Sequence, residues 1–255
     1  MDMRLKQLIL LLCSLLIALP GVSLAREIYL TSADYPPYFS KKLPQQGFIT
    51  QQVKAAFKVM GYQVRLELYP WRRAFRVAQN GMADGMFTLW ETEERKKWFY
   101  YSDPLPPSNI LVFFKMRGLK VKFSSFKDLK PYSIGSVLGY SYPWEFKEAN
   151  IDKQVFHSDP ELIDALVAGK IQLALIDKLQ GEYLLKTQHP LQAELFESMT
   201  PAVSVSPQHL VISKKAQDAR KIIEDFNHGL QQLKENGALQ QIFDSNKPIS
   251  LLKAP

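Results

Sequence analysis

Apolar residues recur at two distinct spacings in the first third of the chain. Over residues 47–60 they recur every three to four positions, which predicts a helix that ends at Gly61. A β-rich run over residues 27–30 precedes this helix, and an alternating run over residues 63–69 follows it. The order predicted here is strand, helix, strand.

A helix that ends at a glycine and leads into a strand is predicted twice more. The first instance is a helix over residues 71–80 before a strand over 85–89, and the second is a helix over 161–168 before an apolar strand over 171–176. Alternating helices and short apolar strands predict an α/β fold with mostly parallel sheets. The repeated design predicts two similar lobes.

Two extended segments flank the second copy of this design. They cover residues 109–116 and 203–213, and we expect them to cross between the lobes. Helical patterns over residues 216–233 and 237–243 follow the second crossing. We expect these closing helices to return to the first lobe.

The beginning of the chain has the pattern of a signal peptide. Arg4 and Lys6 precede an apolar run over residues 8–19, and small residues lead to Ala25. A membrane anchor is the alternative, but the run is shorter than the roughly 20 residues that span a bilayer. We expect cleavage after Ala25 and export to the periplasm.

These expectations divide the chain into a signal peptide and two lobes. The signal peptide is residues 1–25, the first lobe is 26–113 together with 205–255, and the second lobe is 114–204. We expect the mature protein to be a monomer.

Composition excludes several kinds of function. Cys13 is the only cysteine and lies in the expected signal peptide, so the mature chain has no disulfide, catalytic thiol or thiolate metal site. Loss of the signal peptide lowers the net charge from +7 to +6, and acidic residues are interleaved with the basic ones. Nucleic acid is therefore not an expected partner.

Short segments in a characteristic order resemble the family 3 extracellular solute-binding proteins, which include the histidine-binding and lysine/arginine/ornithine-binding proteins of amino-acid ABC transporters. The segments are Tyr35-Pro36-Pro37-Tyr38, Thr92-Glu93-Glu94-Arg95, Tyr101-Ser102-Asp103-Pro104, Ile134-Gly135-Ser136, Ala165-Leu166-Val167-Ala168-Gly169 and Leu175-Ile176-Asp177. The resemblance implies a type II periplasmic binding fold, in which two α/β lobes are joined by two crossing strands and a ligand lies in the cleft between them.

The resemblance assigns the two charged ligand contacts. Arg95 matches the family arginine that holds the α-carboxylate, and its planar guanidinium suits two charge-assisted hydrogen bonds. Asp177 matches the aspartate that receives the ligand ammonium group. The residues alone favour a surface arginine in a run with Lys96 and Lys97. For Asp177 they leave open a strand-end cap or a solvent-facing charge next to Lys178.

The remaining expected contacts are aromatic or carry a hydroxyl group. Tyr35, Tyr38 and Trp71 fall where the family places aromatic walls, although aromatic residues are also common in cores. Thr88 falls where the family places a small hydroxyl residue beside the carboxylate, and Ser141 lies in a glycine–hydroxyl turn.

Three bulky residues depart from the amino-acid-binding pattern. Phe87, Trp90 and Tyr140 stand where small polar residues are usual, and the spacing from Asp84 to Arg95 is one residue shorter. The bulky residues either reshape the pocket or point into the core. The ligand remains open, with an aromatic amino acid, a modified amino acid and a short peptide all permitted.

The sequence favours a binding protein over an enzyme. The four histidines are not spaced as metal ligands, and no nucleophile elbow or phosphate loop is present, so we expect no cofactor and no metal. The expected function is capture of a small, carboxylated, amino-acid-like ligand for an ABC permease. The alternatives are a periplasmic sensor for a signalling receptor and an enzyme similar to the cyclohexadienyl dehydratases.

Overall fold

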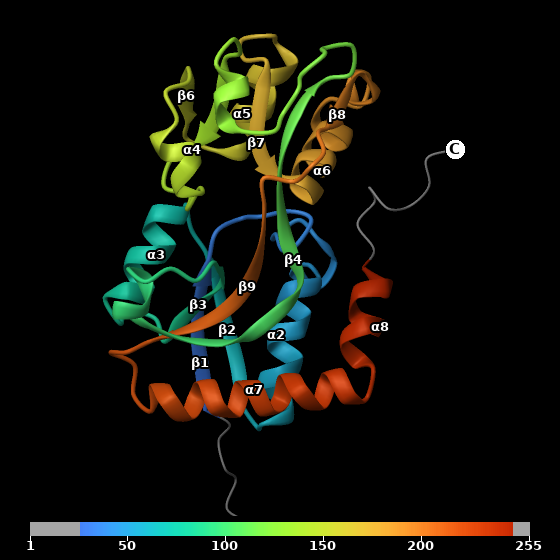
Figure 1. Ribbon diagram of the computed structural model, residues 1–255. Coiled ribbons are helices and arrows are strands. Elements are labelled where there is room, and N and C mark those ends of the chain that lie inside the picture. Colours follow the sequence, from blue (N-terminus) through green and yellow to red (C-terminus); the bar gives the residue numbers. More distant parts are fainter. Residues whose placement is uncertain (1–25, 247–255) are drawn as a thin grey trace, which may run out of the picture.

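A computed structural model describes residues 26–246 of the protein. The expected signal peptide lies outside the described residues. Two lobes stand one above the other, and two long strands pass between them (Figure 1). The hydrogen-bonded strand order is β2-β1-β3-β9-β4-β7-β5-β6, with β8 paired to β4. The two lobes therefore share one hydrogen-bonded path through the crossing strands.

The first lobe contains a parallel sheet in which β1 (Glu27–Ser32) pairs with β2 (Gln63–Leu68) and β3 (Gly85–Leu89). Its helices are α2 (Phe48–Val59), α3 (Trp71–Gln79), α7 (Ala219–Glu235) and α8 (Ala238–Ser245). These elements confirm the predicted helices and strands of the first third of the chain to within two residues at each end.

The closing helices pack on the first lobe, as expected. Phe57 of α2 and Phe226 of α7 lie with their ring centroids 4.9 Å apart. At Gly229 a Cβ atom would stand 2.1 Å from the carbonyl oxygen of Ala56, so only glycine allows the two helices to come this close. Long-range packing, rather than the local pattern, thus fixes α7 against α2.

The second lobe has a sheet of β5 (Ile134–Val137), β6 (Lys153–Phe156) and β7 (Leu173–Asp177), and β5 pairs in parallel with both neighbours. The other elements of this lobe are α4 (Trp144–Glu148), α5 (Asp159–Val167), α6 (Lys178–Gln188) and β8 (Phe196–Ser198). Two clusters of buried apolar side chains form its core, separate from those of the first lobe.

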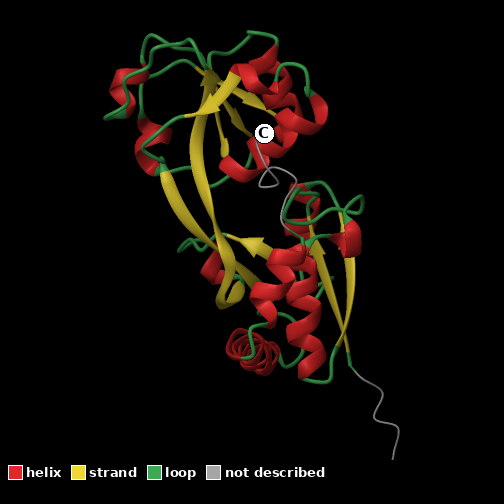
Figure 2. Ribbon diagram, turned by 90° about the vertical axis from the view of Figure 1, so that its right-hand side faces the viewer, coloured by secondary structure: helices red, strands yellow, loops and turns green. Residues whose placement is uncertain are grey.

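The crossing strands are β4 (Phe99–Met116) and β9 (Ser204–Ser213), which pair antiparallel and run side by side between the lobes (Figure 2). They confirm the expected architecture of two α/β lobes joined by two strands. From Leu111 onward β4 also pairs with β7 of the second lobe. Since β4 belongs to both lobes, the boundaries at 113/114 and 204/205 stay a proposal.

The pairing of β4 with β9 is interrupted where the chain passes between the lobes. Leu105 pairs with Gln208 and Asn109 with Ser206, so the register shifts across residues 106–108. Side-chain amides hold this segment in place: Gln52 donates to the carbonyl oxygen of Pro106 at 3.1 Å, and Gln208 to that of Pro107 at 2.7 Å.

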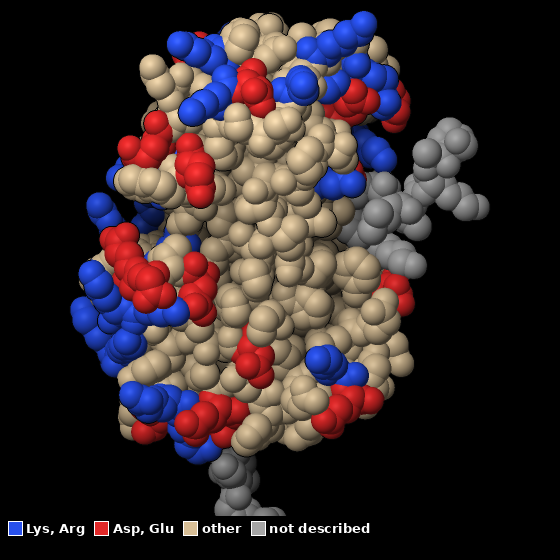
Figure 3. All heavy atoms as spheres, in the orientation of Figure 1, with Lys and Arg blue, Asp and Glu red and all other residues tan. Residues whose placement is uncertain are grey.

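Charges of both signs are interspersed on the face shown in Figure 3, and its centre is largely free of them. This distribution agrees with the mixed charge pattern of the sequence. No helix within residues 26–246 is long and apolar enough to cross a membrane.

Candidate functional site

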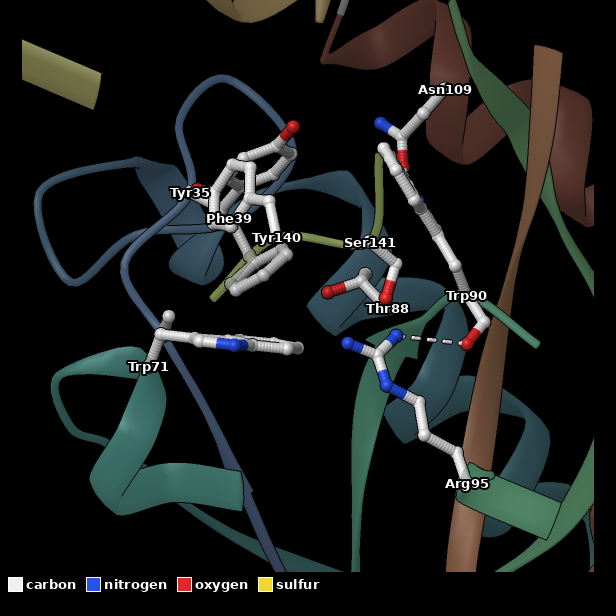
Figure 4. Close-up of a pocket in the computed structure, with 10 residues that line it drawn as sticks. Tyr35, Phe39, Trp71, Thr88, Trp90, Arg95, Asn109, Tyr140 and Ser141 are labelled. Carbon is white, nitrogen blue, oxygen red and sulfur yellow. Dashed lines mark hydrogen bonds between the residues drawn. The ribbon is translucent and has the colours of Figure 1, made fainter. Parts of the chain in front are cut away.

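A cleft of about 460 Å³, counted with its open mouth, lies between the lobes. Ten residues line it: Ala33, Tyr35, Phe39, Trp71, Thr88, Trp90, Arg95, Asn109, Tyr140 and Ser141. Figure 4 labels all of them except Ala33. Eight come from the first lobe and its crossing strand, and Tyr140 and Ser141 come from the second lobe. Five of the seven residues expected from the sequence lie here, namely Tyr35, Trp71, Thr88, Arg95 and Ser141.

Arg95 directs its guanidinium into the space between Trp71 and Trp90 (Figure 4). It begins a short 3₁₀ helix, and its Nη1 donates to the carbonyl oxygen of Trp90 at 3.0 Å. Its Cζ lies 5.7 Å from the centre of the Trp71 ring. No carboxylate of the described chain lies within ion-pair distance of this guanidinium.

Burial lowers the pKa of Arg95. The shift means that the protein surroundings replace only part of the water that would solvate the charge. A guanidinium carries five N–H donors, and within residues 26–246 most of those of Arg95 have no protein acceptor. The side chain is therefore suited to hold an anion that enters the cleft.

Thr88 has an unusual backbone conformation, with a φ of +61°. It stands at the point where the pairing of β3 with β9 shifts register, and its Oγ1 donates to the carbonyl oxygen of Phe87 at 2.7 Å. A left-handed conformation is unfavourable for a β-branched residue, by about 1–2 kcal/mol. Such strain is found most often where a side chain serves a ligand.

Ser141 places a second hydroxyl group near Arg95 from the opposite lobe (Figure 4). It follows a turn at Gly139, whose φ of +86° favours glycine. Arg95, Thr88 and Ser141 together give the cleft one polar end.

Aromatic rings form the other walls. The ring of Trp71 meets that of Tyr140 at 76° with the centroids 6.4 Å apart, which joins the lobes across the cleft. Tyr35 and Phe39 lie above them, and Trp90 closes the opposite side (Figure 4). The lining is therefore mostly apolar, with its polar groups gathered near Arg95.

Tyr38 and Asp177, also expected at the site, lie outside the cleft lining. Their exposed fractions are 1% and 2%. The hydroxyl group of Tyr38 donates to Oδ1 of Asp177 at 2.8 Å, which links the two lobes directly. Asp177 also caps the N-terminus of α6 through a bond from the backbone N–H of Gln180 at 3.0 Å.

The second oxygen of Asp177 binds the crossing strand. Its Oδ2 accepts from Nδ2 of Asn109 at 3.1 Å and from the backbone N–H of Ile110 at 2.9 Å. Nε1 of Trp90 in turn donates to Oδ1 of Asn109 at 2.7 Å. Burial raises the pKa of Asp177, although the four hydrogen bonds to its carboxylate act in the opposite direction.

A second buried carboxylate, Asp159, stands behind the Tyr140 wall. The Tyr140 hydroxyl donates to its Oδ2, whereas its Oδ1 has no protein partner. Burial raises the pKa of Asp159 to about 6. Asp159 lies at the start of α5 and does not line the cleft.

Of the three bulky residues that depart from the amino-acid-binding pattern, one lies in the core and two line the cleft. Phe87 is fully buried, with its ring centroid 5.0 Å from that of Phe39, whereas Trp90 and Tyr140 line the cleft. Sequence reasoning missed the lining residues Ala33, Phe39 and Asn109. Phe39 follows Tyr38 in the same proline-rich loop, and this loop was the only signal that pointed to it.

The described residues contain no group of three or more side chains suited to hold a metal ion.

Residues 28–246 match the bacterial extracellular solute-binding proteins, family 3. The L-cystine-binding protein TcyJ of Escherichia coli (strain K12) is 24% identical over 215 residues, which cover 82% of this chain and 77% of that protein.

Two solved structures have the same fold. An ancestral arginine-binding protein bound to arginine superposes with a TM-score of 0.73 at 23% identity, covering 86% of this chain and 97% of that one. A histidine kinase sensor domain with similarity to periplasmic binding proteins gives 0.72 at 17% identity, covering 87% and 96%.

Proposed function

Because the chain belongs to the bacterial extracellular solute-binding proteins, family 3, we propose that it captures a small, carboxylated, amino-acid-like ligand in the periplasm and delivers it to an ABC permease. One observation carries this proposal: the guanidinium of Arg95 points into the cleft between the lobes and has no carboxylate partner within the described chain.

The polar end of the cleft suits a carboxylate. A guanidinium binds the two oxygens of a carboxylate through parallel N–H donors, and the hydroxyl groups of Thr88 and Ser141 lie on the same side of the cleft (Figure 4). The anion also offsets the cost of burying the Arg95 charge. A carboxylate is therefore the chemical group that this end binds best.

The position of the cleft supports capture by closure of the lobes. Arg95 and Thr88 belong to the first lobe, whereas Ser141 and Tyr140 belong to the second. A ligand that contacts both sets binds the closed arrangement more tightly than an open one, so it shifts the protein towards closure. The ligands in the names of the relatives, L-cystine and arginine, support an amino-acid-like size.

We further propose that the protein is a binder rather than an enzyme. Elimination of water needs an acid placed over the leaving hydroxyl group. Among the described residues that line the cleft, Arg95 is the only charged one, and burial raises the pKa of Tyr35 and of Tyr140 well above the ordinary value. Incubation with prephenate or arogenate, followed by mass analysis, is expected to leave both compounds unchanged.

A thermal-shift screen of carboxylic acids tests the proposed function. A ligand that binds only the folded protein stabilises it by RT ln(1 + [L]/Kd), which is about 2.7 kcal/mol at 100 times Kd, and so raises the melting temperature. We expect at least one small carboxylic acid to do so, and the corresponding amide or alcohol to give no shift. If the amides raise the melting temperature as much as the corresponding acids, the cleft does not recognise a carboxylate and that part of the proposal is wrong.

A further inference from the structure

The proposed function leaves open which other group of the ligand the cleft recognises. Resting on that function, we propose that the cleft recognises the ligand carboxylate but not an α-ammonium group. Its preferred ligands are then carboxylates with an apolar or aromatic body and no amino group next to the carboxylate.

The acceptor expected for the ammonium group is already occupied by donors of the protein. Asp177 accepts four hydrogen bonds from protein donors, two at each oxygen, at 2.8 and 3.0 Å on Oδ1 and at 2.9 and 3.1 Å on Oδ2. A carboxylate offers about four lone-pair positions, so Asp177 has none left for a ligand. It is also 2% exposed and does not line the cleft.

Tyr38 is the donor that sets this arrangement apart from a simple helix cap. Its hydroxyl approaches Asp177 from the opposite lobe, in the space between the first-lobe loop and α6. Tyr35 stacks on Tyr38, with ring centroids 5.3 Å apart at 21°, and itself lines the cleft. Asp177 is therefore covered on the cleft side by Tyr38 and by Asn109, which itself lines the cleft, and both donate to its carboxylate.

The charge of the cleft lining also disfavours an ammonium group on the ligand. Arg95 is the one charged residue among the ten that line the cleft, so a single carboxylate neutralises it. A zwitterion brings an additional positive charge with no carboxylate facing it, and burying an unpaired ammonium group is unfavourable.

Three other acids around the cleft do not supply that partner. Asp159 is buried behind Tyr140, which donates to it. Glu91, on an adjoining hollow, forms an ion pair of 2.6 Å with Lys96. Glu94 lines another adjoining hollow that it shares with Arg72 and Arg76.

The part of the cleft lining that lies opposite Arg95 is aromatic. The rings of Tyr35, Phe39, Trp71, Trp90 and Tyr140 surround the space that the rest of the ligand would fill (Figure 4). Such walls favour burial of an apolar or aromatic group. The cleft thus combines an anion-binding end with an aromatic one.

Matched pairs of acids test the inference on the full mature protein. Each pair is an L-amino acid and the same acid without its amino group: phenylalanine with 3-phenylpropanoate, leucine with 4-methylpentanoate, tryptophan with 3-(indol-3-yl)propanoate, and arginine with 5-guanidinopentanoate. Affinities are measured by thermal shift and calorimetry. We expect the acid without the amino group to bind at least tenfold more tightly in the pairs that bind.

The variant Tyr38→Phe tests the cause. It removes one donor from Asp177 while it keeps the ring, so an oxygen becomes available and the ratio of affinities should move at least fivefold towards the amino acid. Tyr62→Phe is the matched control, because the Tyr62 hydroxyl also donates to an aspartate, Asp225, which lies in the first lobe away from the cleft. We expect no change of the ratio in that control.

The outcomes separate the two proposals. If the amino acids bind as tightly as their partners or more tightly, the inference is wrong and the proposed function stands. If no acid of either kind binds, the proposed function is wrong and the inference with it. If Tyr38→Phe leaves the ratio unchanged, the bond from Tyr38 to Asp177 does not exclude the ammonium group, and that part of the inference is refuted.

Discussion

Replacement of Arg95 by alanine separates binding from folding more sharply than any other change to this protein. Loss of one side of a buried, charge-assisted contact costs about 2–5 kcal/mol of binding free energy. Since about 1.4 kcal/mol corresponds to a factor of ten, Kd should rise roughly 30-fold to several-thousand-fold. The reason is that Arg95 is the one charged group among the lining residues that the structure describes.

The cost to folding is expected to be small. Arg95→Ala removes one hydrogen bond, from Nη1 to the carbonyl oxygen of Trp90, which contributes about 0.5–1.5 kcal/mol. It also removes a guanidinium whose pKa is lowered by burial. Because burying this charged group is unfavourable, its removal offsets part of the stability lost with the hydrogen bond. The free energy of unfolding without ligand should therefore fall by less than about 1.5 kcal/mol.

Calorimetry and thermal shift measure the two effects with the acid that gives the largest response in the screen. At 100 times the wild-type Kd, the wild type gains about 2.7 kcal/mol of stability, and a variant weakened about 1000-fold gains less than about 0.1 kcal/mol. Arg95→Lys keeps the charge but loses the planar fork, so its affinity should be intermediate.

Arg65→Ala is the control for loss of an arginine. Arg65 also lies against an aromatic ring, with its Cζ 3.7 Å from the centre of Tyr29, and it pairs with Glu27 on the surface. We expect unchanged affinity. An Arg95→Ala variant that folds normally and binds as tightly as the wild type would refute the carboxylate clamp.

Three further predictions concern processing, strain and pH. N-terminal sequencing of the periplasmic protein should begin at Arg26, whereas a stable form that retains Met1 would contradict export with cleavage. Thr88→Gly should raise the free energy of unfolding by about 1 kcal/mol, since glycine adopts the φ of +61° without strain, and chemical denaturation measures this; an unchanged or lower stability would mean that the strain is absent. Because the pKa of Asp159 is raised by burial from 3.8 to about 6, the folded state binds its proton more tightly, and the free energy of unfolding falls as pH rises between about 4 and 6. Asp159→Asn lacks this titration, so its stability relative to the wild type should rise by about 3 kcal/mol from pH 4 to pH 7 in urea unfolding, and a constant difference would show that Asp159 does not titrate in this range.

The fold was predictable because local patterns and the motif order agreed. Helices that end at a glycine, such as α2 before Gly61, and short apolar strands such as β3 depend on residues close in sequence. The close approach of α7 to α2 at Gly229 depends on residues far apart in the chain, so no local pattern indicated it.

The composition of the site was predictable only in part, for the same reason. Thr88 lies near the end of β3, and Trp71 and Arg95 begin the helices that follow β2 and β3, which brings the three residues together at the cleft. The surroundings of Asp177 are set by Tyr38 and Asn109, which are 139 and 68 residues away in sequence. The sequence indicated that Asp177 ends a strand. It could not show which donors surround its carboxylate, because two of them come from distant parts of the chain.

The interrupted pairing of the crossing strands gives the connection between the lobes an uneven stiffness. Proline has no N–H to donate, and prolines stand on both strands at the interruption, at Pro106 and Pro107 on β4 and at Pro207 on β9. Fewer backbone hydrogen bonds therefore join the two crossing strands in this short stretch than in the paired segments on either side, so we expect opening of the lobes to bend the connection there. None of these three prolines is among the residues that line the aromatic cleft. Substitutions at these prolines are thus expected to change how readily the lobes open without removing a side chain that lines the cleft.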